Sequence, residues 1–322
     1  MKPLKEFEAQ FPTDEACKAY LVAKRWPDGV RCPRCNRKEK VYALKARPFH
    51  WTCCNTDCGG RKGYRFSVIT HTIFQDTKIP LTTWFRVGYL MLTAKKGVSS
   101  LQVRRIIFGE NSGTDWRTAW YMCHRWRAAM RGDAFRLTGE VEVDETFIGG
   151  KDKNRHASKK SRVARAEAAA RKPSMYRPNE AVGYKKVGVI GAIARKGNVI
   201  ARVVGDMGAR MKADFVNDAV SENVSLVATD EDHSFHYVRE GMPHETVCHS
   251  RGEYVRGNVH TGNIDSFWSL LKRGIVGTFH NVSKDYLALY LNEFSFRHDN
   301  RKNPDMFGTL VTTCAYSNSR SR

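Results

Sequence analysis

The chain has 322 residues, which is long enough for two or three domains with their own cores. Its 54 Lys and Arg residues outnumber 33 Asp and Glu residues, and the formal charge of +21 favours a polyanionic partner, above all nucleic acid. No apolar stretch is long enough to span a bilayer, and the first residues lack the apolar run of a signal peptide. We therefore expect a cytoplasmic protein with no membrane partner.

The N-terminal segment predicts a small metal-binding fold. Residues 1–30 have the pattern of a short helical lead-in that ends near Trp26 and Pro27. Two cysteine groups follow, and in a reducing compartment the nine cysteines of the chain are expected to be free or metal-bound. The first group is Cys32 and Cys35; the second contains Cys53, Cys54 and Cys58.

This spacing predicts a zinc ribbon, in which four thiolates hold a structural Zn²⁺ and leave no open coordination position. We favour Cys32, Cys35, Cys53 and Cys58 as ligands, with Cys54 as the alternative to Cys53. The other interpretation is a group of buried cysteines without a metal.

The middle of the chain is predicted to be helical. After a strand at residues 64–69, helical patterns begin near Pro80, at residue 101 and at residue 114. Two short helices, a turn and a longer helix resemble a helix-turn-helix. Candidate DNA contacts are Arg104, Arg105, Arg117 and Arg125. Alternatively, these arginines solvate a helical bundle.

The second half begins with a strand at residues 139–150. Its alternation places Val141 and Val143 on one face, and Glu142 and Asp144 on the other. Acids on that face also suit an ordinary solvated strand surface. The basic segment 151–186 is expected to be a flexible loop in which Lys159 and Lys160 meet phosphate, or are simply solvated.

Further elements bring more acids into consideration. Residues 187–194 and 199–204 predict a hairpin, residues 212–223 a helix, and residues 225–230 a strand that ends in Asp230. A later helix carries Asp265 and, two turns on, Lys272, and its apolar face consists of Ile264, Phe267, Trp268 and Leu271. This order is that of a ribonuclease-H-like (RNase-H-like) α/β fold.

Three carboxylates at one point would repel each other unless cations lay between them. Asp144, Asp230 and Asp265 offer only oxygen ligands, which suit Mg²⁺ or Mn²⁺. Two such ions would support displacement at a phosphodiester. Each of these aspartates alone is uninformative, and the prediction depends on their combination.

Three sequence runs resemble the bacterial insertion-sequence DDE transposases of the ISXO type, which carry an N-terminal zinc ribbon. The runs are Val143–Gly150, Thr229–Asp230 and Ile264–Gly274, and the resemblance extends over about residues 15–310. It implies that Asp144 and Asp230 are the first two acids of a catalytic triad, that Lys272 is the lysine after the third, and that Arg273 contacts DNA. The family usually has Glu where this chain has Asp265, and some members use Asn, so Asn263 is the alternative third residue.

The resemblance also implies an organisation and an activity. We expect a zinc ribbon at 1–75, a helix-turn-helix-like module at 76–136, an RNase-H-like catalytic domain at 137–310 and a disordered tail at 311–322. The implied enzyme is a nucleoid-associated, Mg²⁺- or Mn²⁺-dependent transposase. It would bind the terminal inverted repeats of its element and target DNA as a homo-oligomer. The alternatives are an inactive regulatory DNA-binding protein and a structure-specific nuclease.

Overall fold

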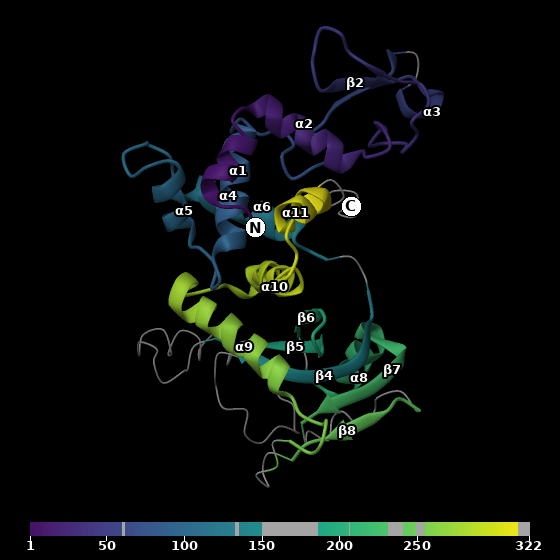
Figure 1. The fold of residues 1–322 in the computed structure, drawn as a ribbon, viewed down its shortest axis with the longest axis vertical. Helices are drawn as coiled ribbons and strands as arrows, with labels where there is room; N and C mark the ends of the chain where they lie inside the picture. Colours follow the sequence, from purple (N-terminus) through teal and green to yellow (C-terminus); the bar gives the residue numbers. More distant parts are fainter. Residues whose placement is uncertain are drawn as a thin grey trace, which may run out of the picture. The chain divides into compact units, whose positions relative to one another are not determined.

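The computed structural model describes residues 1–59, 62–132, 135–149, 186–205, 207–230, 241–248, 253 and 255–314. The chain divides into two compact units (Figure 1). Unit 1 comprises Met1–Ala134, Arg273–His280 and Tyr286–Arg322, and unit 2 comprises Phe135–Lys272 and Asn281–Asp285. This division differs from the expected domains, because most of the segment after residue 272 groups with the N-terminal half. Residues 151–185 of the expected basic insert lie outside the described residues.

Unit 1 begins with the expected helical lead-in and a small sheet. Helix α1 spans Leu4–Gln10 and helix α2 spans Asp14–Arg25, with the Thr13 side chain accepting a hydrogen bond from the backbone N–H of Ala16. Strands β1 (Val41–Ala43), β2 (His50–Cys53) and β3 (Tyr64–Ser67) then form an antiparallel sheet, and the short helix α3 (Thr56–Gly59) follows β2. The predicted helices and the strand near residue 64 are confirmed.

Three helices of unit 1 come from residues 81–129. These are α4 (Leu81–Thr93), α5 (Ser100–Ile107) and α6 (Trp116–Ala129). Ser99 caps α5 and Asp115 caps α6, each by accepting a backbone N–H with its side-chain oxygen. The predicted helices of this region are therefore confirmed, with ends that differ by a few residues.

Two C-terminal helices complete unit 1. They are α10 (Lys284–Asp299), most of which belongs to this unit, and α11 (Met306–Cys314). Helix α11 packs against α2, α4 and α6, and Leu310, Val311 and Cys314 are fully buried. The expected disordered tail is thus wrong for residues 311–314, because their apolar side chains complete the core; residues 315–322 lie outside the described part.

A buried ion pair joins α6 to α10 inside unit 1. The Arg127 guanidinium donates to the Glu293 carboxylate at 2.7 Å, and Arg297 donates to the same group. Burial acts to raise the pKa of Glu293, but the two guanidinium charges outweigh burial and lower it. Glu293 therefore remains charged, and loss of either partner would leave an uncompensated buried charge.

Unit 2 is built on a five-stranded mixed sheet. Its strands are β4 (Leu137–Ile148), β5 (Val187–Ala194), β6 (Val199–Val204), β7 (Val220–Thr229) and β8 (His244–Thr246), in the order β6-β5-β4-β7-β8. Pairs β4–β5 and β5–β6 are antiparallel, whereas β4–β7 and β7–β8 are parallel. The predicted hairpin is confirmed at both strands. The helix expected at 212–223 is α8 (Ala209–Ala219), which ends earlier because Val220 already pairs with Leu137.

Helices cover both faces of this sheet. Phe215 and Val216 of α8 pack with Val141 and Val143 on one face. Asp144 alternates with these valines and therefore points to the other face. There, helix α9 (Gly262–Gly274) places Trp268 and Ile264 against Gly191 of β5. The predicted apolar face of α9 is confirmed, since Ile264, Phe267, Trp268 and Leu271 are all buried.

A short π-helix, Ile275–Phe279, follows α9. Among the described residues, no helix combines the length and the apolar character that crossing a bilayer requires.

Candidate metal centres

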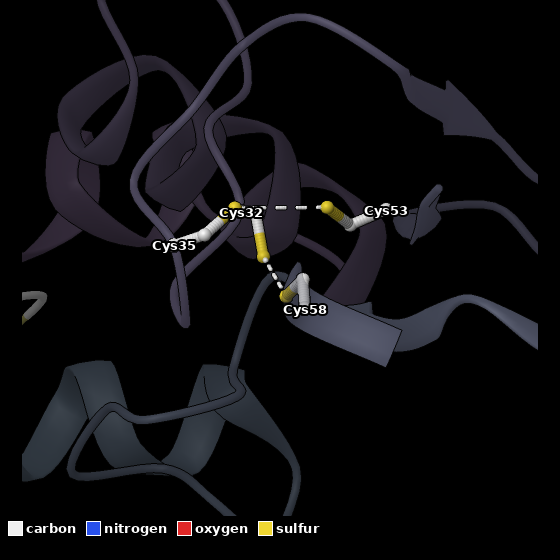
Figure 2. Close-up of side chains that lie close together, drawn as sticks. All are labelled: Cys32, Cys35, Cys53 and Cys58. Atoms are coloured by element: carbon white, nitrogen blue, oxygen red, sulfur yellow. Dashed lines mark hydrogen bonds between the residues drawn. The ribbon is translucent and has the colours of Figure 1, made fainter. Parts of the chain in front are cut away.

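Four cysteines of unit 1 form a compact cluster. Figure 2 shows the side chains of Cys32, Cys35, Cys53 and Cys58 pointing toward one another, and their sulfur atoms all lie within 4.8 Å of one another. The Sγ atoms of Cys32 and Cys58 are 3.4 Å apart, and those of Cys35 and Cys53 are 3.7 Å apart. Zn–S bonds of about 2.3 Å in a tetrahedron place sulfurs roughly 3.8 Å apart, so the cluster fits Zn²⁺. Cys54 is exposed and is not part of the cluster.

Neighbouring N–H groups donate hydrogen bonds to the sulfur atoms of the cluster and so stabilise their thiolate forms. The Asn55 side chain donates to Cys53 Sγ at 3.2 Å, and the backbone N–H of Arg34 donates to Cys32 Sγ at 3.4 Å. Burial acts to raise the pKa of Cys53, but the hydrogen bonds from Asn55 outweigh it and lower the pKa to about 7. Burial and the adjacent thiol groups raise the pKa of Cys58. Full ionisation of the four thiols therefore needs a cation, which a structural zinc supplies.

The three aspartates lie in unit 2, although among the described residues only the four cysteines bring their ligand atoms close enough together to hold a metal ion. Asp144 lies on β4, Asp230 directly follows β7, and Asp265 lies in the first turn of α9. Because β4 and β7 are parallel neighbours, with Glu142 paired to Ala228, Asp144 and Asp230 lie at the same level of the sheet. Burial raises the pKa of Asp144 to about 7, and the negative charges of Asp230 and Asp265 add to this shift. A bound cation would offset this mutual repulsion and favour the charged form of Asp144.

A tryptophan holds the first aspartate. The indole Nε1–H of Trp268 donates to Asp144 Oδ2 at 3.0 Å. Gly191 faces Asp144 across the β4–β5 pair, and a Cβ at Gly191 would lie 2.6 Å from the indole ring. The sequence predicts Trp268 as a core residue; its hydrogen bond to Asp144 has no sequence signal.

Asp265 and Asn263, the two candidates for the third residue of the triad, have different surroundings. Asp265 is exposed, and its carboxylate accepts from the Thr261 hydroxyl at 3.4 Å. The side-chain amide of Asn263 instead donates to Glu142 at 2.7 Å. The negative charge of Asp265 is near enough to raise the pKa of Asp144, whereas the side chain of Asn263 is engaged by Glu142.

Two lysines lie on the helices of this region. Lys272 is exposed on α9, two turns after Asp265, and Arg273 beside it is also exposed. Lys212 of α8 is buried, and its ammonium donates to Glu145 at 2.6 Å. Since Glu145 is adjacent to Asp144 in the chain, Lys212 offsets part of the local negative charge; sequence analysis did not identify it.

The four arginines proposed as DNA contacts divide into two pairs. Arg104 donates to the backbone oxygens of Thr114 and Glu110, and Arg125 donates to the backbone oxygen of Ile73. These two side chains hold loop backbone in place. Arg105 and Arg117 are exposed, with carboxylate neighbours at 3.2 and 3.7 Å. Lys159 and Lys160 lie outside the described residues.

Unit 1 thus holds a four-cysteine cluster that fits a metal ion, and unit 2 is a mixed α/β unit that carries the three aspartates. The sequence profile described as the ISXO2-like transposase domain matches residues 136–299, and the one described as the transposase zinc-ribbon domain matches residues 12–61. The chain therefore belongs to the ISXO2-like transposase family, as its motifs indicated.

A curated relative extends this similarity over nearly the whole chain. It is described as an uncharacterized protein in transposable element ISH50 of Halobacterium salinarum. The two sequences are 26% identical over 309 residues, which cover 94% of this chain and 96% of the relative. No solved structure matches the chain.

Proposed function

We propose that the protein is the DNA transposase of an insertion sequence, which binds the terminal inverted repeats of its element and cuts and joins DNA strands there. The observation that carries this proposal is that Asp230 and Asp265 lie near enough to the partly buried Asp144 for their charges to act on it, inside the segment that matches the ISXO2-like transposase domain. The order of strand, hairpin, helix, strand and acid-bearing helix supports an RNase-H-like catalytic domain.

Asp144, Asp230 and Asp265 would hold two Mg²⁺ or Mn²⁺ ions. When bound, such ions activate an attacking oxygen and stabilise the leaving oxygen in phosphodiester displacement. The indole N–H of Trp268 donates to Asp144 Oδ2 and so orients this carboxylate as a ligand. Lys272 would bind a phosphate near the reacting bond. Because the acids serve as ligands and not as nucleophiles, no covalent protein–DNA intermediate is expected.

DNA recognition would fall to unit 1. Zinc held by Cys32, Cys35, Cys53 and Cys58 would stabilise the ribbon, proposed for residues 1–75, and the helices of residues 76–136 would bind the repeats. The exposure of Arg105 and Arg117 supports direct phosphate contacts, whereas Arg104 and Arg125 would act by holding the loops. Arg273, Lys159 and Lys160 would add phosphate contacts in a homo-oligomeric complex with target DNA.

The test is cleavage of DNA that carries the ends of the element, with and without Mg²⁺. Asp144→Asn should reduce cleavage by about 10³-fold or more, because a residue that would hold the ions loses its negative charge, and should leave DNA binding intact. Asp218→Asn, an exposed acid on α8, is the matched control and should cut normally.

Cleavage by Asp144→Asn at the rate of the unaltered protein would contradict the metal assignment. Tight binding to the ends without any cutting would indicate a regulatory protein. Cutting without joining of the freed 3′-hydroxyl to target DNA would indicate a nuclease.

A further inference from the structure

Glu142 is a buried carboxylate in unit 2, two residues before Asp144 on the same face of β4. Its side chain has no solvent exposure. It accepts hydrogen bonds from the backbone N–H groups of Asn263 at 2.7 Å and Ile264 at 3.1 Å, and from the Asn263 side chain at 2.7 Å. The face of β4 that carries Glu142 and Asp144 could have been solvated. At Glu142 it is instead covered by the start of α9.

These hydrogen bonds satisfy the first turn of α9. The first N–H groups of a helix have no partner within the helix, and a negative charge there is stabilising. The N–H of Gly262 is bound by His260 Nδ1 at 3.3 Å, and the next two are bound by Glu142. Thr261 precedes the helix, but its hydroxyl donates to Asp265. Glu142 of strand β4 thus caps α9, and Thr261, which precedes the helix, orients Asp265.

Arg195 compensates the buried charge and extends the connection. This residue follows β5, and its Nε donates to Glu142 Oε1 at 3.0 Å. The same guanidinium donates to Glu140 and to the backbone oxygen of Asn258, in the segment that leads into α9. A buried carboxylate is tolerated when it is paired and hydrogen-bonded in this way. Glu142 and Arg195 together fasten the start of α9 to β4 and β5.

We propose that Glu142 is a positioning residue that fixes the start of α9 against β4 and so sets the separation between the Asp144 and Asp265 carboxylates. The proposal rests on the proposed function, since the two acids are taken to bind the same pair of ions. Asp144 is two residues from Glu142 on the strand, and Asp265 is two residues from Asn263 on the helix. Any shift of the helix start therefore changes the distance between the acids.

The experiment compares Glu142→Gln with Glu140→Gln. In Glu142→Gln the new side chain has nearly the same shape as the carboxylate but only one acceptor oxygen, so either the backbone N–H groups of α9 or the Asn263 and Arg195 side chains face an NH₂ group. Glu140 also pairs with Arg195 but makes no hydrogen bond to α9 among the described contacts, so it is a matched control. Three quantities are measured: amide exchange at Asn263 and Ile264 in metal-free protein, Mn²⁺ affinity, and the kcat and KM of cleavage of element ends.

For Glu142→Gln we expect faster exchange at both amides, about 10- to 100-fold weaker Mn²⁺ binding and a similar fall in kcat, with KM for DNA unchanged. Glu140→Gln should match the unaltered protein in all three. If Glu142→Gln does not fold, Arg195→Lys, which keeps the charge but not the forked contacts, should show the same changes to a smaller degree.

The outcomes separate the two proposals. Faster amide exchange together with unchanged Mn²⁺ affinity and kcat would overturn the positioning role and leave the proposed function intact. Unaltered protein that binds no Mn²⁺ and cuts no element ends would overturn the proposed function, and the positioning role with it.

Discussion

The two candidate metal centres differ in how far apart their residues lie in the chain. Cys32 and Cys58, the ends of the cysteine cluster, are 26 residues apart, and one small sheet with its loops positions all four thiols. Glu142 and Asn263, which precede Asp144 and Asp265 by two residues each, are 121 residues apart, and β5, β6, α8, β7 and β8 lie between them in the chain. A local site can therefore be recognised from spacing, whereas a dispersed site depends on tertiary contacts that leave no spacing signal.

The sharpest test of the local site compares two adjacent cysteines. Cys53→Ser should abolish most zinc binding and unfold the ribbon, because the binding energy of a structural zinc, on the order of 10 kcal/mol, is also folding energy. Cys54→Ser should keep its zinc, since Cys54 is exposed and outside the cluster. Zinc per chain and the circular dichroism of the purified variants measure this. Equal zinc loss in both would contradict the assignment of Cys53.

The dispersed site can be tested at its third acid. Asp265→Asn should lower cleavage by about 10³-fold, or roughly 4 kcal/mol of activation free energy, through loss of a metal ligand. Asn263→Ala should lower it only about 10-fold, because it removes one hydrogen bond to Glu142. Cleavage rates of both variants, measured with zinc content unchanged, show which residue is the third of the triad. A larger effect at Asn263 would make Asn263 the third residue.

Packing under α9 provides a test of the tertiary contacts alone. Gly191→Ala would place a Cβ 2.6 Å from the Trp268 indole, and the resulting shift should reduce the free energy of unfolding by about 1–3 kcal/mol. Gly205→Ala, at a position with no atom within 4 Å of a new Cβ, is the control and should be neutral. Denaturant unfolding of both proteins measures the difference. Equal stability of the two variants would show that the close approach of Trp268 to Gly191 does not exclude a side chain at position 191.

The last prediction concerns the part of the pH dependence that His124 contributes in unit 1. Burial, followed by the charge of Arg127, lowers the pKa of His124 to about 4, although the charge of Glu293 acts in the opposite direction. The unfolded chain takes up this proton near pH 6.5 and the folded chain only near pH 4. The stability contributed by neutral His124 is therefore complete above about pH 6.5 and is lost as the pH falls through about 4.

His124→Phe, which keeps a ring against Trp120 and Tyr286, should show a shallower loss of thermal stability between about pH 6.5 and 4 than the unaltered protein. Parallel curves for the two proteins would show that His124 does not contribute to this acid sensitivity.

Sequence patterns anticipated most elements of the fold. The strands at 187–194 and 199–204, the apolar face of α9 and the helices α4, α5 and α6 follow from periodicity and capping residues. Strand β8 and helix α11 were not anticipated, because β8 is very short and α11 adjoins a polar C-terminal end. The end of α8 was expected four residues too late, since the pairing of Val220 with a distant strand decides where the helix ends.

The sequence by itself determined the cysteine spacing, the three aspartates, the basic charge and the family to which the chain belongs. Only the tertiary structure decided which of two adjacent cysteines joins the cluster and which side chains surround the acids. Trp268 and Glu142 bond to residues more than a hundred positions away, and Lys212 contacts Glu145 from another element. The physical reason is that hydrogen bonds and burial depend on distance in space, whereas sequence patterns report only neighbours along the chain.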